Sequence, residues 1–323
     1  MTDDALRRAA ETAIDQCLAL QAGESCAVVT DDKRKPIGEA LYAVASERTD
    51  DATIVRYPPG EQHGAEPPDP VAAAMREADV FVAPTTKSLT HTLARSNATD
   101  AGARGATMPG ITEDVMIRGL DADYEAIADA CVDLLEQVGN ATEIRVTSPQ
   151  GTDVTFEPGD RPWKEDVGLN HEPGEYSNLP AGEVFVSPVD ANGTYVVDGT
   201  MMPHGRLGPD QRLEFDVADG YVTRISDDAI REQVEEASEE VGKAAYNLAE
   251  LGIGANVGVA ELVGSVLLDE KAGGTVHIAI GDDHAIGGDT TAPIHLDGIL
   301  TEPTVLADGE VVDLPQDERE RTK

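Results

Sequence analysis

Residues 26–55 read CAVVTDDKRKPIGEALYAVASERTDDATIV, and this stretch decides the fold class. Its two ends, Cys26-Ala-Val-Val and Ala52-Thr-Ile-Val, are short apolar runs of the kind that form buried strands. Between them, the segment from Ile37 to Val44 has the pattern of a helix. A strand, a helix and a second strand in this order favour a parallel sheet.

The same alternation continues on both sides of this stretch. Further helices are predicted at residues 4–20, 71–77 and 121–137, and further strands at residues 79–84 and 104–108. After Gly139 the pattern changes to short strands separated by turns, interrupted by one long helix predicted at residues 228–249. We therefore predict an α/β protein with two domains. Residues 1–139 would form an N-terminal, Rossmann-like domain with a doubly wound, mostly parallel sheet, and residues 140–323 a β-rich α+β metal-binding domain.

The composition is strongly acidic, with a formal net charge of -38 and 40% hydrophobic residues. Acidic residues are spread over the whole length, so we interpret them as an adaptation to a salty cytosol, in which salt screens their repulsion. The alternative is a specific binder of cationic ligands. Either interpretation argues against nucleic acid as a partner. No apolar run has the length of a membrane span and the three cysteines are scattered, so we expect a cytoplasmic protein without a membrane partner.

Three residues near the C-terminus have side chains that commonly bind metals. His277 lies in Val-His-Ile-Ala-Ile-Gly, and His295 and Asp297 lie in Ile-His-Leu-Asp-Gly. On a strand, residues two apart point to the same side, so His295 and Asp297 would present an imidazole and a carboxylate together. This combination suits zinc, cobalt, manganese or iron. The alternative interpretation is two core histidines and an aspartate that caps a helix.

A second metal ion would need additional carboxylates, and Glu183 and Glu250 are two of the candidates. Glu183 opens the apolar run Val184-Phe-Val-Ser-Pro, where a buried charge needs a partner. Glu250 would end the predicted long helix, where an unpaired acid is unfavourable. For each of them the alternative is a solvated surface acid.

Four blocks in order carry a resemblance to a known family. They are Asn178-Leu-Pro-Ala-Gly-Glu-Val-Phe-Val-Ser-Pro, Leu248-Ala-Glu-Leu-Gly-Ile-Gly, Asp269-Glu-Lys-Ala-Gly-Gly-Thr-Val-His-Ile-Ala-Ile-Gly-Asp and His295-Leu-Asp-Gly. Together they resemble the aminopeptidase T / aminopeptidase S family of metallopeptidases, most strongly over residues 175–312. The resemblance implies a homodimer and two divalent ions (Zn, Co, Mn or Mg), with five ligands: Glu183, Glu250, His277, His295 and Asp297.

The resemblance implies an aminopeptidase, a hydrolase that removes N-terminal residues from small peptides through a metal-activated water. Glu250 and Glu183 are its candidate bridging ligands, and a carboxylate that does not bind tightly would shuttle the proton. His284 stands where the family has a tyrosine, and with Asp283 it is a candidate for catalytic support. The segment between His277 and His295 is shorter than in the well-studied peptidases.

A second hypothesis belongs to a different reaction class. His277, His295 and Asp297 also form a two-histidine, one-carboxylate triad, which suits iron(II) and dioxygen. A dihydroxypyridine ring-opening dioxygenase branch resembles the same family and uses such a triad. The feature that separates the two hypotheses is whether Glu183 and Glu250 reach the metal. A third hypothesis is a non-catalytic metal-binding relative.

Overall fold

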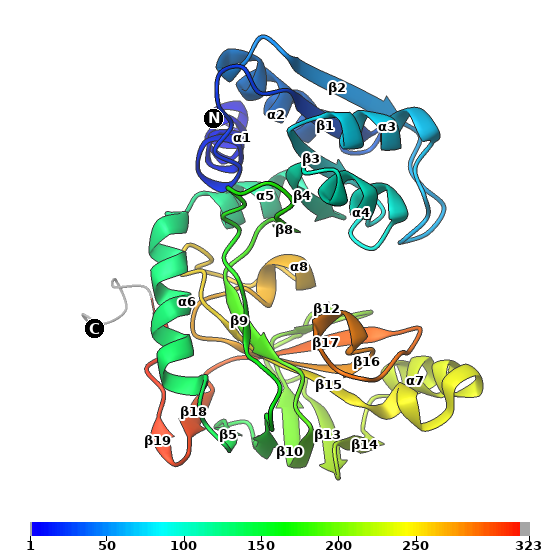
Figure 1. Ribbon diagram of the computed structural model, residues 1–323. Coiled ribbons are helices and arrows are strands. Elements are labelled where there is room, and N and C mark those ends of the chain that lie inside the picture. Colours follow the sequence, from blue (N-terminus) through cyan, green and yellow to red (C-terminus); the bar gives the residue numbers. More distant parts are fainter. Residues whose placement is uncertain (1, 317–323) are drawn as a thin grey trace. The chain divides into compact units, whose positions relative to one another are not determined.

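A parallel sheet of five strands organises the first part of the structure, a computed structural model that describes residues 2–316 (Figure 1). Its strand order is β2-β1-β3-β4-β8, and every neighbouring pair is parallel. The strands are β1 (Cys26–Asp31), β2 (Ala52–Tyr57), β3 (Val80–Thr85), β4 (Arg104–Pro109) and β8 (Tyr176–Asn178). β1 and β3 are buried along their whole lengths, as their apolar sequences predict.

Helices cover both faces of this sheet. On one face, a Cβ on Gly38 would stand 2.7 Å from Thr30 of β1. On the other face, Val71 and Met75 pack in one apolar cluster with Val29. Thr30 and Val29 are adjacent in a strand and point to opposite faces, which confirms the predicted doubly wound arrangement. The helices of this part of the chain are α1 (Thr2–Glu11), continued by the π-helical segment Thr12–Cys17, α2 (Lys35–Arg48), α3 (Asp69–Glu77), α4 (Leu93–Asp100) and α5 (Glu113–Leu120). Helix α6 (Tyr124–Val138) follows, and its Cys131 Sγ contacts the carbonyl of Glu183, a residue outside this sheet.

The first of two antiparallel sheets has the strand order β14-β13-β10-β6-β5-β18-β19. Its strands are β5 (Ile144–Thr147), β6 (Asp153–Glu157), β10 (Asp190–Val197), β13 (Leu213–Ala218), β14 (Tyr221–Ile225), β18 (Thr304–Ala307) and β19 (Glu310–Val311). Tyr195 of β10 and Phe215 of β13 are buried and stacked, with ring centroids 4.6 Å apart.

The second antiparallel sheet has the order β12-β11-β17-β16-β15-β9-β7. Its strands are β7 (Lys164–Asp166), β9 (Glu183–Val186), β11 (Thr200–Met201), β12 (Gly205–Arg206), β15 (Leu248–Gly254), β16 (Val276–Gly281) and β17 (His295–Leu300). Gly298 of β17 lies directly against Val197 of β10, where a Cβ would be 2.4 Å from the valine methyl. One face of this sheet therefore packs on the first antiparallel sheet.

The helix predicted at residues 228–249 is shorter in the structure. Helix α7 (Asp228–Val241) begins at Asp227, whose carboxylate accepts a hydrogen bond from the Ile230 amide, and it ends at Gly242 with φ 63°. A 3-10 segment (Gly242–Tyr246) follows, and the chain then enters β15. The apolar residues after Gly242 are compatible with either a helix or a buried strand, and sheet pairing decides between them. The remaining short helices are α8 (Val266–Asp269) and the 3-10 turn His284–Ile286.

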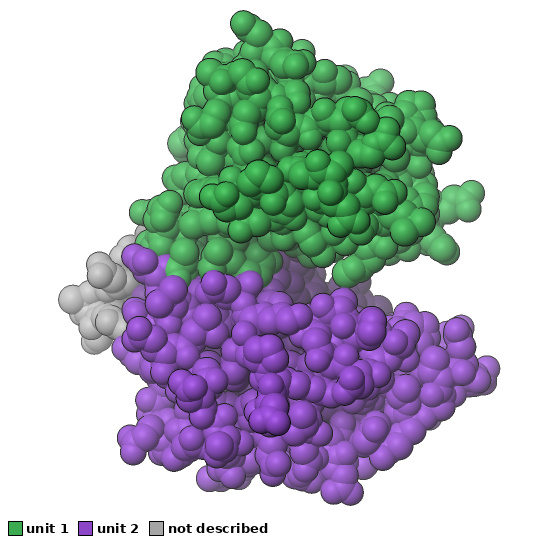
Figure 2. Space-filling view, in the orientation of Figure 1, with its two compact units in different colours: residues 1–128, 166–181 green, residues 129–165, 182–323 purple. Residues whose placement is uncertain are grey.

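The chain divides into two units by its internal contacts, coloured separately in Figure 2. One unit comprises Met1–Ala128 and Asp166–Ala181, and the other Asp129–Glu165 and Gly182–Lys323. The parallel sheet belongs to the first unit and the antiparallel sheets belong to the second. That the two domains divide at residue 140 stays a prediction. Across residues 2–316, no helix combines the length and apolarity that crossing a bilayer requires.

Candidate metal centre

The five predicted ligands lie on four adjacent strands of the second antiparallel sheet. Each strand contributes at least one side chain: Glu183 from β9, Glu250 from β15, His277 from β16, and His295 and Asp297 from β17. Glu250 is thus in a central strand and not at a helix end, which corrects its predicted setting. We call these five residues together with Glu270 and Lys271 the cluster.

The strand register brings these side chains to one face of the sheet. Ala279 of β16 pairs with Glu250 on one side and with Asp297 on the other. Residues paired across an antiparallel ladder point to the same side, so the two carboxylates flank a small residue. Asp297 and Gly298 point to opposite faces. The cluster therefore lies on the face turned away from the first antiparallel sheet.

Two local features of β15 make this arrangement possible. The register shifts between Leu248 and Glu250, and irregularities of this kind re-aim side chains near functional sites. Gly252 pairs with His277, and a Cβ on Gly252 would stand 2.0 Å from the His277 Nε2. The imidazole of His277 thus occupies the space that any side chain at Gly252 would need.

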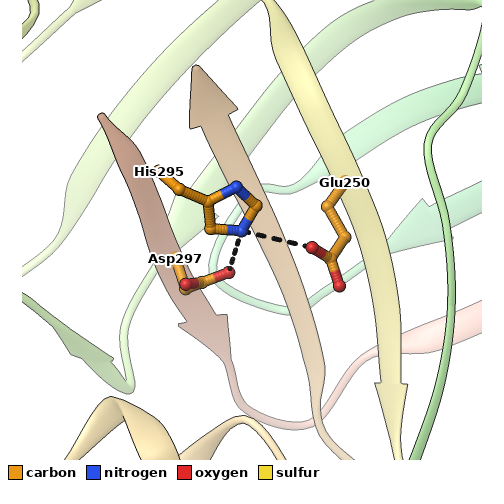
Figure 3. A group of neighbouring side chains, drawn as sticks. All are labelled: Glu250, His295 and Asp297. Atoms are coloured by element: carbon orange, nitrogen blue, oxygen red, sulfur yellow. Dashed lines mark ion pairs between the residues drawn. The ribbon is translucent and has the colours of Figure 1, made fainter. Parts of the chain in front are cut away.

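The carboxylate of Glu250 lies between two imidazoles. Its Oε2 is 3.2 Å from His295 Nε2, which is also 3.3 Å from Asp297 Oδ1 (Figure 3). Its Oε1 is 3.2 Å from His277 Nε2. One ligand atom each from Glu250, His295 and Asp297 lies within 4.8 Å of the others, so these three residues form a candidate metal site.

The ring of His295 is oriented through its other nitrogen. His295 Nδ1 lies 2.7 Å from the carbonyl oxygen of Asp282, the first residue after β16. When Nδ1–H donates to that carbonyl, Nε2 keeps its lone pair toward Glu250 and Asp297, which is how a ligating histidine is usually held.

Lys271 is a member of the cluster that the sequence did not predict. Its side chain is buried, and Nζ contacts Glu183 Oε1 at 2.6 Å and Glu270 Oε1 at 2.5 Å. The other oxygen of Glu183, Oε2, is 3.4 Å from His277 Nε2. The sequence alone does not show that Lys271 belongs to this site, because its role becomes visible only when its acidic partners are known to be buried.

The electrostatics of the cluster follow from burial and close charges. Burial raises the pKa of Glu183 to about 7, although Lys271 opposes the rise. Burial lowers the pKa of His277, but its hydrogen bond to Glu250 and the charge of Glu183 outweigh this and raise it to about 9. For His295 the charge of Asp297 likewise outweighs burial, so its pKa lies well above the ordinary value. Without a metal, these raised pKa values favour protonated imidazoles as counter-charges to the acids. A bound cation would displace the Nε2 protons and take over that role.

The cluster fits a metal ion on two further grounds. Glu183 Oε2, which faces the cluster, is buried and has no hydrogen-bond partner among the described residues. Such orphaned atoms are uncommon and point to a group that the protein alone does not supply. Two imidazoles and several carboxylates are also suitable donors for zinc, manganese or iron.

The two residues predicted to give catalytic support lie away from these contacts. His284 is exposed at the start of a 3-10 turn, and none of the ion pairs of the cluster includes it. Asp283 is buried, but its carboxylate accepts hydrogen bonds from Ser187, Asn247 and the Thr290 amide instead of facing the cluster.

The fold and the cluster define an α/β protein with a candidate metal centre of histidines and carboxylates. The family model for 2,5-dihydroxypyridine 5,6-dioxygenase (NicX) matches residues 6–314, and the chain therefore belongs to that family. The fold resembles the solved structure of a 2,5-dihydroxypyridine dioxygenase from Pseudomonas putida KT2440, with 20% identity, 100% of both chains covered and a TM-score of 0.77. It also resembles wild-type AmpT from Thermus thermophilus, with 16% identity, 97% of this chain and 100% of that chain covered, and a TM-score of 0.67. No curated protein sequence matches the chain.

The family match overturns the predicted membership of the aminopeptidase T / aminopeptidase S family. The predicted function of a metallo-aminopeptidase, and with it the hydrolase class and proteolysis, is wrong: the family is one of dioxygenases, which are oxidoreductases. Structures with both names share this fold. The sequence blocks that carried the resemblance therefore identify the fold and the ligand-bearing face, and they do not decide which reaction takes place there.

Proposed function

We propose that this protein is a ring-cleaving dioxygenase that acts on 2,5-dihydroxypyridine or a close analogue with one iron(II) ion. The observation that carries the proposal is the convergence of His277, His295 and Asp297 around Glu250 on one sheet face, in a chain of the 2,5-dihydroxypyridine 5,6-dioxygenase family. Two histidines and one carboxylate with open positions are the usual iron(II) set of non-haem oxygenases.

Glu250, His295 and Asp297 lie close enough together to hold the ion, and His277, which contacts Glu250, would be the second histidine of the triad. Glu250 contacts both imidazoles, at 3.2 Å in each case. Glu183 has a different role in this proposal, because Lys271 holds its Oε1 by an ion pair at 2.6 Å. A carboxylate whose charge is already compensated is a weaker competitor for a cation.

When bound, iron(II) supplies the redox chemistry that dioxygen needs to react with an aromatic ring. The overall reaction breaks the ring bond between carbons 5 and 6, and both oxygen atoms enter the product. The ring supplies all the electrons, so no external reductant is required.

The residues of the chain would bind the ring and handle its protons. A ring hydroxyl becomes a better donor of electrons when it loses its proton. Glu183 Oε2 is the candidate proton acceptor because it is buried and has no hydrogen-bond partner among the described residues. Lys271 keeps the opposite oxygen, Oε1, fixed. The cluster is more open at His295, because 33% of the His295 side chain is exposed. A small ring would enter the cluster beside this residue.

The test is oxygen consumption by protein loaded anaerobically with iron(II) in molar KCl. We expect equimolar loss of dioxygen and of 2,5-dihydroxypyridine, followed in an oxygen electrode and by ultraviolet absorbance. Zinc-loaded protein and the His295→Ala variant are the controls, and both should be inactive. If iron-loaded protein consumes neither this compound nor its isomers, a metal-binding relative without catalysis would be the better description.

A further inference from the structure

Asp283 is a buried carboxylate that connects the strands of the metal centre outside the cluster itself. Its side chain is 1% exposed. Oδ2 accepts hydrogen bonds from Ser187 Oγ at 2.9 Å and from Asn247 Nδ2 at 3.0 Å, and Oδ1 accepts one from the Thr290 amide at 2.6 Å. Arg161 Nη1 lies 3.6 Å away and supplies the opposite charge.

The residues that donate hydrogen bonds to Asp283 lie in the chain just outside the strands that carry the cluster. Ser187 comes directly after β9, the strand of Glu183. Asn247 comes directly before β15, the strand of Glu250. Asp283 itself lies in the segment that joins β16 to β17, and the backbone amide of Thr290 belongs to the same segment. A single carboxylate therefore ties together the ends of all four ligand-bearing strands.

Backbone hydrogen bonds and close packing hold the segment 282–294 against the Asp283 carboxylate. The Gly288 amide donates to the Asp283 carbonyl at 2.8 Å, and a Cβ on Gly288 would stand 2.0 Å from the Asp283 carboxyl carbon. The Asp283 amide donates to the Thr290 carbonyl at 3.1 Å, and the Asp282 amide to the Ile294 carbonyl at 2.8 Å. These contacts fix the peptide between Asp282 and Asp283.

That peptide carries the carbonyl that orients His295. The Asp282 oxygen is 2.7 Å from His295 Nδ1, and a rotation of the peptide would remove this acceptor. We infer that Asp283 is a positioning residue of the metal centre: it holds the Asp282 carbonyl against His295 and keeps β9, β15, β16 and β17 in register at the end of the sheet where His295 lies. The inference rests on the proposed function only in assuming that the cluster binds a divalent ion.

The hydrogen-bonding chemistry of a carboxylate distinguishes this role from ordinary core stabilisation. A carboxylate accepts from all of its donors at once, whereas an asparagine in its place turns an amide nitrogen toward Ser187, Asn247 or Thr290. Two donors would then face each other, and the segment 282–294, which includes the Asp282 carbonyl, would have to shift to separate them. Loss of a group that orients a ligating histidine typically weakens metal binding about 10- to 100-fold.

Asp198 provides a matched control at the opposite end of β17. It is also buried, with 7% of its surface exposed, and its carboxylate accepts hydrogen bonds from the amide and hydroxyl of Thr301, directly after the strand. Asp198→Asn should disturb the fold about as much as Asp283→Asn does. It leaves the Asp282 carbonyl and the His295 ring in place.

The experiment measures the dissociation constants of Mn²⁺ and Zn²⁺ by calorimetry, with thermal unfolding of the metal-free proteins in parallel. We expect Asp283→Asn to bind both ions about 10- to 100-fold more weakly than the parent, and Asp198→Asn to bind within about two-fold of it. Equal weakening in both variants, or unchanged binding by a folded Asp283→Asn, would overturn the inference. If the parent itself binds neither ion, the assumed metal site fails, which is a separate result.

A milder variant covers the case in which Asp283→Asn does not fold. Ser187→Ala removes one donor to Asp283, together with the hydroxyl that accepts a hydrogen bond from Arg161 Nη1 at 2.7 Å, and it leaves Asn247 and Thr290 in place. We expect a weaker affinity for the same ions, by less than the roughly 10-fold loss expected when the whole carboxylate is replaced. An affinity equal to that of the parent in Ser187→Ala would then count against the role of Asp283.

Discussion

His277 lies directly over Gly252, because the two residues are paired across β15 and β16 and a Cβ on the glycine would be 2.0 Å from His277 Nε2. Position 252 needs a glycine because the imidazole of His277 occupies the space of a side chain there, and not because the backbone conformation demands one. The absence of a side chain on one strand therefore creates the space for a candidate ligand on the next.

We predict that Gly252→Ala displaces the His277 ring and weakens metal binding at least about ten-fold. The cost in the free energy of unfolding should be about 1–3 kcal/mol, the range for an added methyl group in a packed site. Calorimetric titration with Mn²⁺ measures the first effect and urea unfolding the second. Gly208→Ala is the control, since a Cβ there meets nothing within 4 Å. Parent-like affinity in Gly252→Ala would show that His277 does not need this space.

A second prediction concerns the stabilisation of the fold by its metal. A ligand at 100 times its Kd stabilises the folded state by about 2.7 kcal/mol, so saturating Mn²⁺ should raise the unfolding midpoint and EDTA should reverse the rise. His295→Ala removes the nitrogen that contacts both Glu250 and Asp297, and its midpoint should not respond to the metal. Exposed His171, which contacts the Gln16 carbonyl far along the sequence, provides a control variant, His171→Ala, that should respond like the parent. An equal response in His295→Ala would place the bound ion elsewhere.

The sequence predicted the fold class and residues that the structure brings together in the candidate metal site, for identifiable reasons. Apolar runs such as Cys26-Ala-Val-Val have few alternatives to a buried strand, and the spacing of His295 and Asp297 places both on one side of any strand. The setting of Glu250 was predicted wrongly, because its surroundings suit a helix or a strand equally well. Lys271 gave no local signal, since its role depends on Glu183, which is distant in sequence. The reaction was predicted wrongly because fold and ligand types are shared between reaction classes.

Lys271 allows a prediction about buried charge. Lys271→Met would leave Glu183 and Glu270 in a buried site without their ammonium partner, and removal of one member of a buried pair costs about 3–5 kcal/mol. Urea unfolding in metal-free buffer at pH 9, above the pKa of about 7 that burial gives Glu183, measures the loss. The triple variant with Glu183→Gln and Glu270→Gln should recover part of it, because the uncompensated charges are then gone. Full stability in the single Lys271→Met variant would mean that the two acids are protonated or solvated when the lysine is absent.

The last prediction concerns the pH dependence of the first unit. Arg104 is buried and donates two hydrogen bonds to the carboxylate of Glu24, at 2.8 and 2.7 Å, and this pairing lowers the pKa of Glu24 below its ordinary value of 4.5. A carboxyl whose pKa is lower in the folded state contributes stability above its unfolded pKa and loses that contribution as the pH falls through the folded pKa. Glu24→Gln should therefore lower the free energy of unfolding by about 2 kcal/mol at pH 7, and the difference from the parent should shrink progressively below about pH 4.5.

Glu47→Gln is the matched control. The pKa of Glu47 is also lowered, by Arg7, but that pair is exposed, so its loss should change the free energy of unfolding little at any pH. Urea unfolding of the parent and both variants between pH 3 and pH 7 gives the comparison, and a difference between Glu24→Gln and the parent that stays constant over this range would contradict the linkage.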